Sequence, residues 1–459
     1  MAQNAALDAL AADLPDAGIV FDVGEKYMGD WLMRAGPDDT PLALARPKTT
    51  EAVSRLLSFC NEHHIPVVPQ GGLTGLAGGA TPVKGALLIS MERMNTIAAI
   101  DLVSHTMTVE AGVPLQQIQE AADAAGLMFP LDIGSRGSCQ IGGNLSTNAG
   151  GNRVLRYGMA RDMVLGLEVV LADGTVISAM NEMMKNNAGY DLKQMFLGSE
   201  GTLGIITRAV LKLFAKPHSV AIALTAHADY HALERFLTRT RAQLGGALTA
   251  FEVMWPEFYA RGIARSRGAA PLPNGAGAYA LIEASASDDS AEAQLGKLLE
   301  LGLEQGLIDD AVLAQSLQQS QQIWAVRDSS GELTKDFSPI GNFDVSLATS
   351  RIDAFVADCR TRLESQWPGV ECYFFGHVVD GNIHLIAGNF AAGDTLKLEE
   401  TVYAGVRDFG GSISAEHGIG LQKRDHLDYS RSAAEIALMR QIKVALDPNS
   451  ILNPGKVLR

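Results

Sequence analysis

Apolar and polar positions between residues 39 and 217 alternate with two different periods. In the segment TTEAVSRLLSFCNEHH (49–64), Val53, Leu56, Leu57 and Cys60 recur at helical spacing, which predicts an amphipathic helix. Short apolar runs rich in β-branched residues predict strands, and Asp173-Gly174 marks a hairpin turn inside the last of them. These runs are IPVVP (65–69), LLISM (87–91), TIAAIDLV (96–103), HTMTVEAG (105–112) and VLGLEVVLADGTVIS (164–178).

From about Lys216 the pattern changes to strands that alternate with longer helices. Strand-like runs lie at 219–226 and 278–286, each followed by a helical pattern, at 231–244 and 291–307. The same elements recur as RIDAFVADCRTRL (351–363) and VECYFFGHVVDGNIHLIAG (370–388). This order predicts an α+β layer, in which an antiparallel sheet is covered by helices on one side. The last residues predict a helix, and DPNSILNPGKV then forces a turn.

Composition narrows the class of protein. The chain has 459 residues, enough for two or three domains, and its 47% apolar and 19% charged residues are typical of a globular protein. A net charge of −15 disfavours nucleic acid and anionic lipid as partners. No apolar run approaches the ~18 residues of a membrane span, and the first residues do not resemble a secretory signal. Four scattered cysteines indicate a reducing compartment, so we expect a cytoplasmic protein.

Glycine gathers in three blocks that predict a ligand. The segment PQGGLTGLAGG (69–79) follows a predicted strand and holds five glycines, whose backbone N–H groups can approach an anion closely. A tight loop without a ligand is the alternative for this block alone. Two further dense blocks, 130–158 and 185–207, favour a long ligand such as a dinucleotide. The first block, 69–79, does not match G-x-G-x-x-G, so a nicotinamide-binding unit is not supported.

Two histidines and a glutamate form a candidate metal site. His377 and His384 would lie about 23 Å apart on one extended strand. The intervening Asp380-Gly381-Asn382 predicts a turn that lets both imidazoles converge. Glu416 offers a carboxylate, and this ligand set suits Zn²⁺ or Mn²⁺. The alternative is that both histidines are structural polar residues of a hairpin.

Together these blocks resemble the p-cresol methylhydroxylase (PCMH) and vanillyl-alcohol oxidase superfamily of flavoenzymes. From Ala45 to the end they are most similar to the D-2-hydroxyglutarate dehydrogenases and their D-lactate and glycolate dehydrogenase relatives. The resemblance implies a PCMH-type FAD-binding domain (1–217) and a substrate, or cap, domain with the metal site (218–425). A helical segment (426–459) would then return to the FAD domain.

The resemblance also implies the residues that hold FAD, which would be non-covalent because the first glycine loop has no histidine. The pyrophosphate residues are Pro69, Gln70, Gly71, Gly72, Leu73, Thr74, Gly75, Gly78 and Gly79. The rest of the flavin and ADP would meet Pro130, Leu131, Gly134, Ser138, Gly142, Gly143, Asn144, Thr147, Asn148, Gly150 and Gly151. The adenine half would meet Gly201, Gly204 and Ile206, and the isoalloxazine ring Asn453.

By the same resemblance His377, His384 and Glu416 bind one divalent metal, expected to be Zn²⁺ with Mn²⁺ or Fe²⁺ as alternatives. His417 would take the hydroxyl proton of a D-2-hydroxy acid while flavin N5 accepts the hydride. The electron acceptor would be an electron-transfer flavoprotein, a cytochrome or a quinone. A homodimer is compatible with the sequence.

The substrate pocket departs from the D-2-hydroxyglutarate branch. Arg327 matches the family's substrate arginine, but Gly331, Asn342 and Ile386 stand where that branch has a threonine, a lysine and an asparagine. The candidate substrate residues are therefore Arg327, Asn342, Lys335 and His417. By the resemblance D-2-hydroxyglutarate is the first candidate, and Lys335 would then replace a lost contact to its second carboxylate. The lost contacts favour the alternative, D-lactate or another D-2-hydroxy monocarboxylate. Remoter alternatives are an oxidase of the same fold and an FAD-binding subunit of a larger complex.

Overall fold

The computed structural model describes residues 2–265 and 270–459, which form two compact units. The first unit comprises the residues up to Gly151, Gly158–Ala215 and Glu416–Arg459; the second comprises Asn152–Tyr157 and Lys216–Ala415. The sequence predicts boundaries near 217 and 425, whereas the units divide after Ala215 and after Ala415. Glu416 and His417 are therefore grouped with the first unit.

A small parallel sheet in the first unit presents the first glycine block. Its order is β1-β3-β2, with β1 at Ala43–Ala45, β2 at Val67–Gln70 and β3 at Leu87–Ser90. The predicted helix is confirmed as α2, Thr50–Glu62, and its predicted apolar face is buried. The Thr49 side chain begins α2 by accepting a hydrogen bond from the Ala52 N–H. Because β2 ends at Gln70, residues 71–79 follow the carboxyl end of a parallel strand, where ligands commonly bind.

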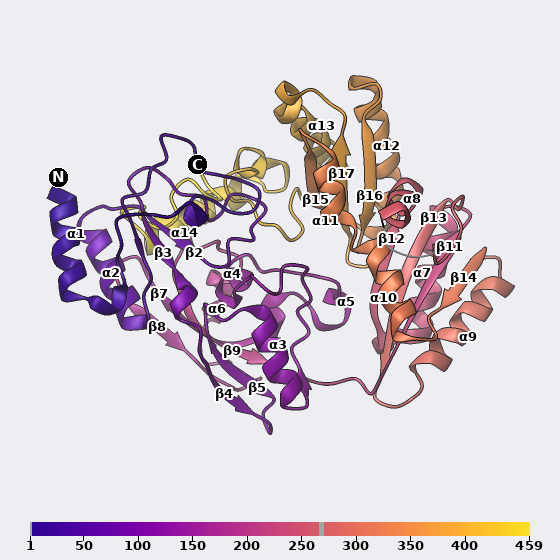
Figure 1. The fold of residues 1–459 in the computed structure, drawn as a ribbon, viewed down its shortest axis with the longest axis horizontal. Coiled ribbons are helices and arrows are strands. Elements are labelled where there is room, and N and C mark those ends of the chain that lie inside the picture. The colour runs from indigo at the N-terminus through magenta and orange to yellow at the C-terminus, as the bar shows by residue number, and fades with distance from the viewer. Residues whose placement is uncertain (1, 266–269) are drawn as a thin grey trace. The chain divides into compact units, whose positions relative to one another are not determined.

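An antiparallel sheet forms the other layer of the first unit, in the order β4-β5-β9-β7-β8 (Figure 1). Its strands are β4 Ile97–Asp101, β5 Thr106–Glu110, β7 Val164–Val170, β8 Val176–Ala179 and β9 Ile205–Lys212. The predicted hairpin is confirmed, since β7 pairs with β8 across a turn in which Gly174 has φ +88°. A short pair joins β6 (Leu127–Met128) to β10 (Phe214–Ala215).

Short helices complete the first unit. They are α1 (Ala2–Asp13), α3 (Leu115–Ala124), α4 (Ile141–Ser146), α6 (Lys193–Phe196) and α14 (Ala433–Leu446). The predicted C-terminal helix is α14, and the chain after it pairs with β2: Val67 donates to the Ile451 carbonyl and Asn453 donates to the Val67 carbonyl, both at 2.7 Å.

The second unit is built on a seven-stranded sheet in which every neighbouring pair is antiparallel, as predicted. The order is β14-β11-β13-β12-β16-β17-β15 (Figure 1). The strands are β11 Ser219–His227, β12 Leu248–Met254, β13 Ala278–Ala286, β14 Asp310–Leu313, β15 Gly341–Ser346, β16 Glu371–Gly376 and β17 Asn382–Gly388.

Helices cover both faces of this sheet, so the expectation of helices on one side is wrong. Phe375 stacks on Phe258 of α8, whereas the Arg360 guanidinium of α12 lies over the ring of Phe374. Successive residues of a strand point to opposite faces, so α8 and α12 lie on opposite sides. The helices are α5 (Val154–Tyr157), α7 (Tyr230–Leu244), α8 (Pro256–Arg265), α9 (Ala291–Glu304), α10 (Leu317–Arg327), α11 (Ser330–Leu333), α12 (Ile352–Gln366) and α13 (Thr395–Asp408). Among the described residues, none of the helices has the length and apolar content needed to cross a membrane.

Candidate functional site

The three glycine blocks line one cavity in the first unit. Close packing requires glycine at several of these positions: a Cβ on Gly72 would lie 2.0 Å from the Ser138 carbonyl oxygen. The predicted cofactor residues that line the cavity are Pro69, Gln70, Gly71, Gly72, Leu73, Thr74, Gly75, Gly79, Gly142, Gly143, Asn144, Thr147, Gly150, Gly151, Gly201, Gly204, Ile206 and Asn453. Those outside its lining are Gly78, Pro130, Leu131, Gly134, Ser138 and Asn148.

Five buried side-chain oxygens in the cavity wall have no hydrogen-bond partner among the described residues: Asp30 Oδ2, Gln70 Oε1, Gln140 Oε1, Asn144 Oδ1 and Asn453 Oδ1. Buried polar atoms are normally hydrogen-bonded, so this wall is suited to a ligand that carries several donors. FAD has ribityl and ribose hydroxyls and a flavin N–H, so the residues present fit it.

Two of these oxygens have a well-defined orientation. Gln70 Nε2 donates to the carbonyl oxygens of Tyr27 and Ala80, at 2.9 Å each. Asn453 Nδ2 donates to the carbonyl oxygens of Gly79 at 3.0 Å and Glu200 at 2.7 Å. Because each NH₂ group donates to two carbonyl oxygens, the nitrogen and the oxygen of each side-chain amide can be told apart. The side-chain oxygens of Gln70 and Asn453 therefore remain as acceptors for a ligand.

Glu416 and His417 line the same cavity. The Gly151 N–H donates to Glu416 Oε1 at 2.8 Å. A Cβ on Gly150 would lie 2.3 Å from that oxygen, so the glycine pair allows the carboxylate to approach the backbone. The first unit thus brings the predicted metal carboxylate and the predicted base to the predicted cofactor residues.

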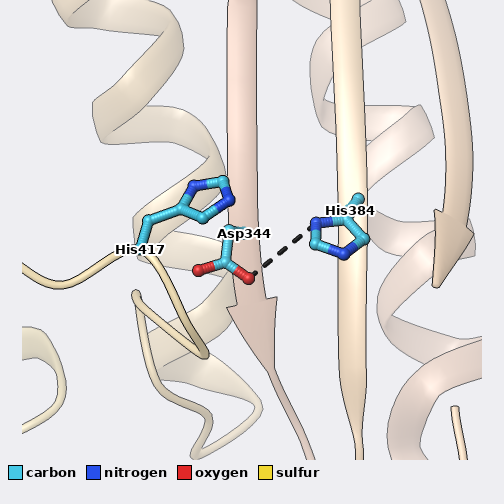
Figure 2. A group of neighbouring side chains, drawn as sticks. All are labelled: Asp344, His384 and His417. Atoms are coloured by element: carbon cyan, nitrogen blue, oxygen red, sulfur yellow. Dashed lines mark ion pairs between the residues drawn. The ribbon is translucent and has the colours of Figure 1, made fainter. Parts of the chain in front are cut away.

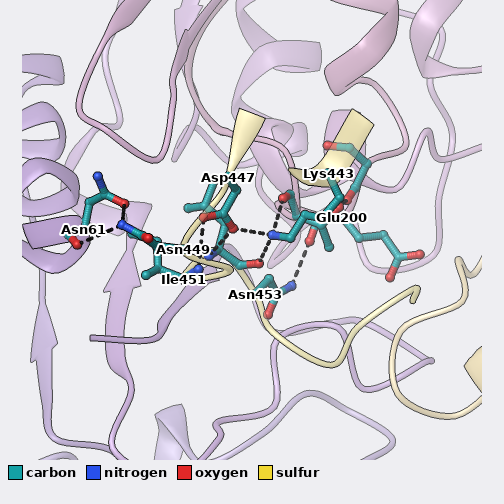
Figure 3. A network of polar contacts seen from close by, with 10 residues as sticks. Asn61, Glu200, Lys443, Asp447, Asn449, Ile451 and Asn453 are labelled. Carbon is teal, nitrogen blue, oxygen red and sulfur yellow. Dashed lines mark hydrogen bonds and ion pairs between the residues drawn. The ribbon is translucent and has the colours of Figure 1, made fainter. Parts of the chain in front are cut away.

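Glu200 holds the segment that follows His417. Its carboxylate accepts from the Ile419 N–H at 2.7 Å and from the Gly420 N–H at 2.9 Å. Burial raises the pKa of Glu200, and the two N–H groups act in the opposite direction. Figure 3 shows Glu200 beside Asn453, whose side chain donates to the Glu200 carbonyl oxygen.

A half-buried lysine anchors the C-terminal segment that carries Asn453. Lys443 Nζ donates to the carbonyl oxygens of Thr202 and Leu452, each at 2.8 Å, and forms an ion pair with Asp447 (Figure 3). The Asp447 carboxylate in turn accepts from the backbone N–H groups of Ile451 and Leu452. This network joins the C-terminal helix α14 to the strand-like segment that reaches the cavity.

In the second unit, the predicted turn at Asp380-Gly381-Asn382 folds β16 back onto β17 and brings the two histidines together. The rings of His377 and His384 have centroids 5.5 Å apart, and one nitrogen of each lies within 4.8 Å of the other. Both are buried, at 5% and 8% exposure, so water competes little for their nitrogen atoms.

A fully buried carboxylate stands behind His377. Glu252 Oε1 lies 2.5 Å from His377 Nδ1, and Oε2 accepts from Arg327 Nε at 2.8 Å. Arg327 Nη2 lies 3.2 Å from His377 Nε2. Burial by itself would raise the pKa of Glu252, but the charges and hydrogen bonds of His377 and Arg327 outweigh it and lower the pKa to about 2.

A second buried carboxylate stands beside His384. Asp344 on β15 lies directly opposite His384 on β17, with Oδ1 3.8 Å from Nδ1 (Figure 2). The Ala415 N–H donates to Asp344 Oδ2 at 3.2 Å. Ala415 is the last residue of the second unit and Glu416 is the next residue of the chain. Asp344 therefore holds the backbone at the last residue of the second unit.

The structure does not bring all the predicted substrate residues to one place. Arg327 ends α10 and is buried against Glu252 and His377. Asn342 lies two residues before Asp344 on β15, opposite Ile386. Lys335 lies on the surface, with its side chain 65% exposed and ion-paired to Glu332 at 2.6 Å.

Sequence reasoning missed Glu252, Asp344, Glu200, Asp30 and Gln140. The sequence pattern could have indicated Glu252 and Asp344, because each is the one acidic residue in a mostly buried strand. Acidic residues are rarely buried without a partner. Glu283 on β13 shows the same pattern but contacts Thr249 and not a predicted site residue. The pattern therefore does not distinguish site carboxylates from other buried carboxylates.

Comparison with known proteins agrees with this geometry. The family model described as FAD binding domain matches residues 41–179, and that of the C-terminal domain of FAD linked oxidases matches residues 216–457. A D-2-hydroxyglutarate dehydrogenase of Xanthomonas citri pv. viticola is 40% identical, over 94% of this chain and 92% of that protein. A mitochondrial D-2-hydroxyglutarate dehydrogenase of Bos taurus is 40% identical, over 94% of this chain and 78% of that protein.

A solved structure of p-cresol methylhydroxylase with substrate bound shares the fold, with a TM-score of 0.78 at 19% identity. The match covers 99% of this chain and 96% of that one. The resemblance noted in the sequence, to PCMH-type flavoenzymes and within them to the D-2-hydroxyglutarate dehydrogenases, is confirmed.

Proposed function

The chain belongs to the family of FAD-linked oxidases, and from this premise we propose that it is a dehydrogenase of D-2-hydroxyglutarate that yields 2-oxoglutarate. Two relatives named as D-2-hydroxyglutarate dehydrogenases are 40% identical to this chain, and each match covers 94% of it. The observation that carries the proposal is the buried pair His377 and His384, each with a buried carboxylate within 4 Å of its ring, on one hairpin. Such carboxylate–histidine pairs are typical of metal sites.

The proposed metal ligands are His377, His384 and Glu416. Two imidazoles and a carboxylate are a suitable donor set for Zn²⁺, with Mn²⁺ or Fe²⁺ as alternatives. Glu416 directly follows Ala415, whose backbone N–H donates to Asp344 beside His384. A divalent ion, when bound, supplies a Lewis acid for the hydroxyl oxygen of the substrate.

The remaining roles, which are cofactor binding, substrate binding and proton transfer, belong to residues of the chain. The cavity wall with its five buried acceptors binds the cofactor. FAD, when bound, supplies the acceptor for the hydride that leaves C2 of the acid. Arg327 binds the substrate carboxylate through its guanidinium. His417 takes the hydroxyl proton onto a ring nitrogen, so that loss of the proton and of the hydride together leaves a keto acid.

One observation favours a second candidate, a D-2-hydroxy monocarboxylate such as D-lactate. The β15–β17 pair presents Asn342 opposite Ile386, an amide and an apolar side chain, where a second carboxylate would require a cation. Lys335, the proposed replacement, is exposed and paired with Glu332.

An anaerobic titration tests the proposal. The purified flavoprotein is mixed with D- and L-2-hydroxyglutarate and with D- and L-lactate, before and after removal of metal by a chelator. We expect the flavin absorbance to bleach with a D-acid only, and bleaching to stop in the metal-free protein and return with Zn²⁺. Bleaching that survives complete metal removal contradicts the metal's role. His417→Asn should retain flavin and bleach at least a hundredfold more slowly.

For the electron acceptor we propose an electron-transfer flavoprotein, a cytochrome or a quinone, since no nicotinamide motif is present. The four cysteines are buried and unpaired, which supports a reducing compartment. The relatives include a bacterial and a mitochondrial protein. For this chain we propose the cytoplasm. Reoxidation of the reduced protein by each acceptor class separates the three acceptors.

A further inference from the structure

The Glu252 carboxylate is fully shared between two functional side chains. Glu252 lies on β12 and is 1% exposed. One oxygen, Oε1, lies 2.5 Å from His377 Nδ1, and the other, Oε2, accepts from Arg327 Nε at 2.8 Å. A single acidic group thus contacts both the proposed metal ligand and the proposed substrate arginine.

The first contact determines which nitrogen of His377 faces the metal. A carboxylate accepts but does not donate, so Nδ1 carries a proton whether the ring is charged or neutral. In the neutral ring, which is the form that binds a metal, Nε2 therefore presents the lone pair. Arg327 Nη2, a cationic donor, lies 3.2 Å from that Nε2. The nitrogen atom that a metal would require therefore already faces a positive group.

The second contact fixes the guanidinium plane. Arg327 is 8% exposed, lies over the ring of Phe375 at 5.2 Å and is held at Nε by Glu252. A buried cation beside a divalent ion is unfavourable unless an anion offsets the charge. Glu252 supplies that negative charge, since its two oxygens contact the His377 ring and the Arg327 guanidinium.

We infer, on the basis of the proposed function, that Glu252 is a positioning residue which couples metal binding to binding of the substrate carboxylate. It holds His377 in the tautomer that binds the ion, and it holds Arg327 in the plane that meets the carboxylate. Loss of the carboxylate therefore weakens both the metal contact of His377 and the substrate contact of Arg327, although Glu252 lies outside the lining of the cofactor cavity.

The chain offers a matched control in Glu283 on the neighbouring strand β13. Glu252 pairs with Leu281, and Glu283 lies two residues further on, so both carboxylates lie on one face of the sheet. Glu283 is 5% exposed; it accepts from Thr249 Oγ1 at 2.9 Å and pairs with Arg153 at 3.4 Å. Glu283→Gln thus makes the same change of a buried acid to its amide away from His377.

The test measures Zn²⁺ affinity of the FAD-loaded protein by titration with Zn²⁺ against a competing chelator. We expect Glu252→Gln to lower Zn²⁺ affinity about tenfold or more and to raise KM for the D-acid, with flavin content unchanged. Glu283→Gln should keep wild-type Zn²⁺ affinity and KM. A Glu252→Gln protein whose affinity and KM match those of Glu283→Gln overturns the inference.

Two further variants keep the outcome interpretable. His377→Ala tests the metal site itself: if it binds Zn²⁺ as tightly as the wild type, the proposed function is wrong at that point, whatever Glu252 does. If Glu252→Gln does not fold, Glu252→Gln/Arg327→Met replaces it, because this pair also removes the buried cation. Its Zn²⁺ affinity should be lower than that of Arg327→Met alone, and equal affinities contradict the role of Glu252.

Discussion

The carboxylate of Glu200 accepts a hydrogen bond from the backbone N–H of Ile419 at 2.7 Å, across more than two hundred residues of sequence. Gly420 donates to the other oxygen, and His417 lies two residues before Ile419. Glu200 thus determines where the proposed base lies relative to the cavity wall.

Glu200→Gln should slow flavin reduction by the D-acid at least tenfold while most of the flavin stays bound. The amide can accept from one of the two N–H groups, but its NH₂ faces the other, which costs about 1–3 kcal/mol. Stopped-flow absorbance measures the rate, and Glu62→Gln, at an exposed end of α2, is the control. A variant that reduces its flavin at the wild-type rate shows that the segment does not need this carboxylate.

Asn453→Ala should weaken FAD binding roughly tenfold. The substitution removes a buried amide oxygen that faces the cavity and frees the carbonyl oxygens of Gly79 and Glu200. Fluorescence of released flavin during dilution measures the affinity. Asn449→Ala is the control, because Asn449 is exposed and donates to Asn61 outside the cavity lining. Equal FAD affinity in the two variants rules out a contact between Asn453 and the cofactor.

Lys443→Met should lower the melting temperature by roughly 6 °C or more. It leaves the buried Asp447 carboxylate without its cation, and breaking a buried pair costs about 3 kcal/mol. Lys443→Met/Asp447→Asn should recover part of the loss, because the uncompensated charge is gone. Thermal unfolding followed by flavin fluorescence compares the two. No recovery in the double variant means that the ion pair is not the source of the stability.

His227 should make the stability depend on pH. It is fully buried on β11, and burial lowers its pKa to about 4 although its hydrogen bond to the Leu307 carbonyl acts in the opposite direction. Between pH 6.5 and 4 the unfolded chain binds a proton that the folded protein does not. The free energy of unfolding therefore falls as pH falls, by up to about 1.4 kcal/mol per pH unit.

Urea unfolding across this pH range should show a shallower fall for His227→Gln than for the wild type. His218→Gln, at an exposed position just before the same strand, serves as the control and should follow the wild type. Parallel pH profiles for all three proteins mean that His227 is not the group that titrates.

Local patterns predicted the parts of this protein that depend on neighbouring residues. The glycine blocks, the Asp173-Gly174 hairpin and the turn between His377 and His384 were readable because turn chemistry acts over a few residues. The buried stripe of α2 was readable for the same reason. The covering of both sheet faces by helices was not, since the choice of face depends on packing between distant elements.

The sequence by itself determined the family, the cofactor class and the histidine hairpin. Only the tertiary structure decided that Glu252 stands behind His377, that Asp344 stands beside His384 and that Glu200 holds the segment after His417. Those contacts depend on the strand order β12-β16-β17-β15 and on the return of the C-terminal segment to the first unit. Pairing between strands far apart in sequence is set by the packing of the whole core, and no local spacing encodes it.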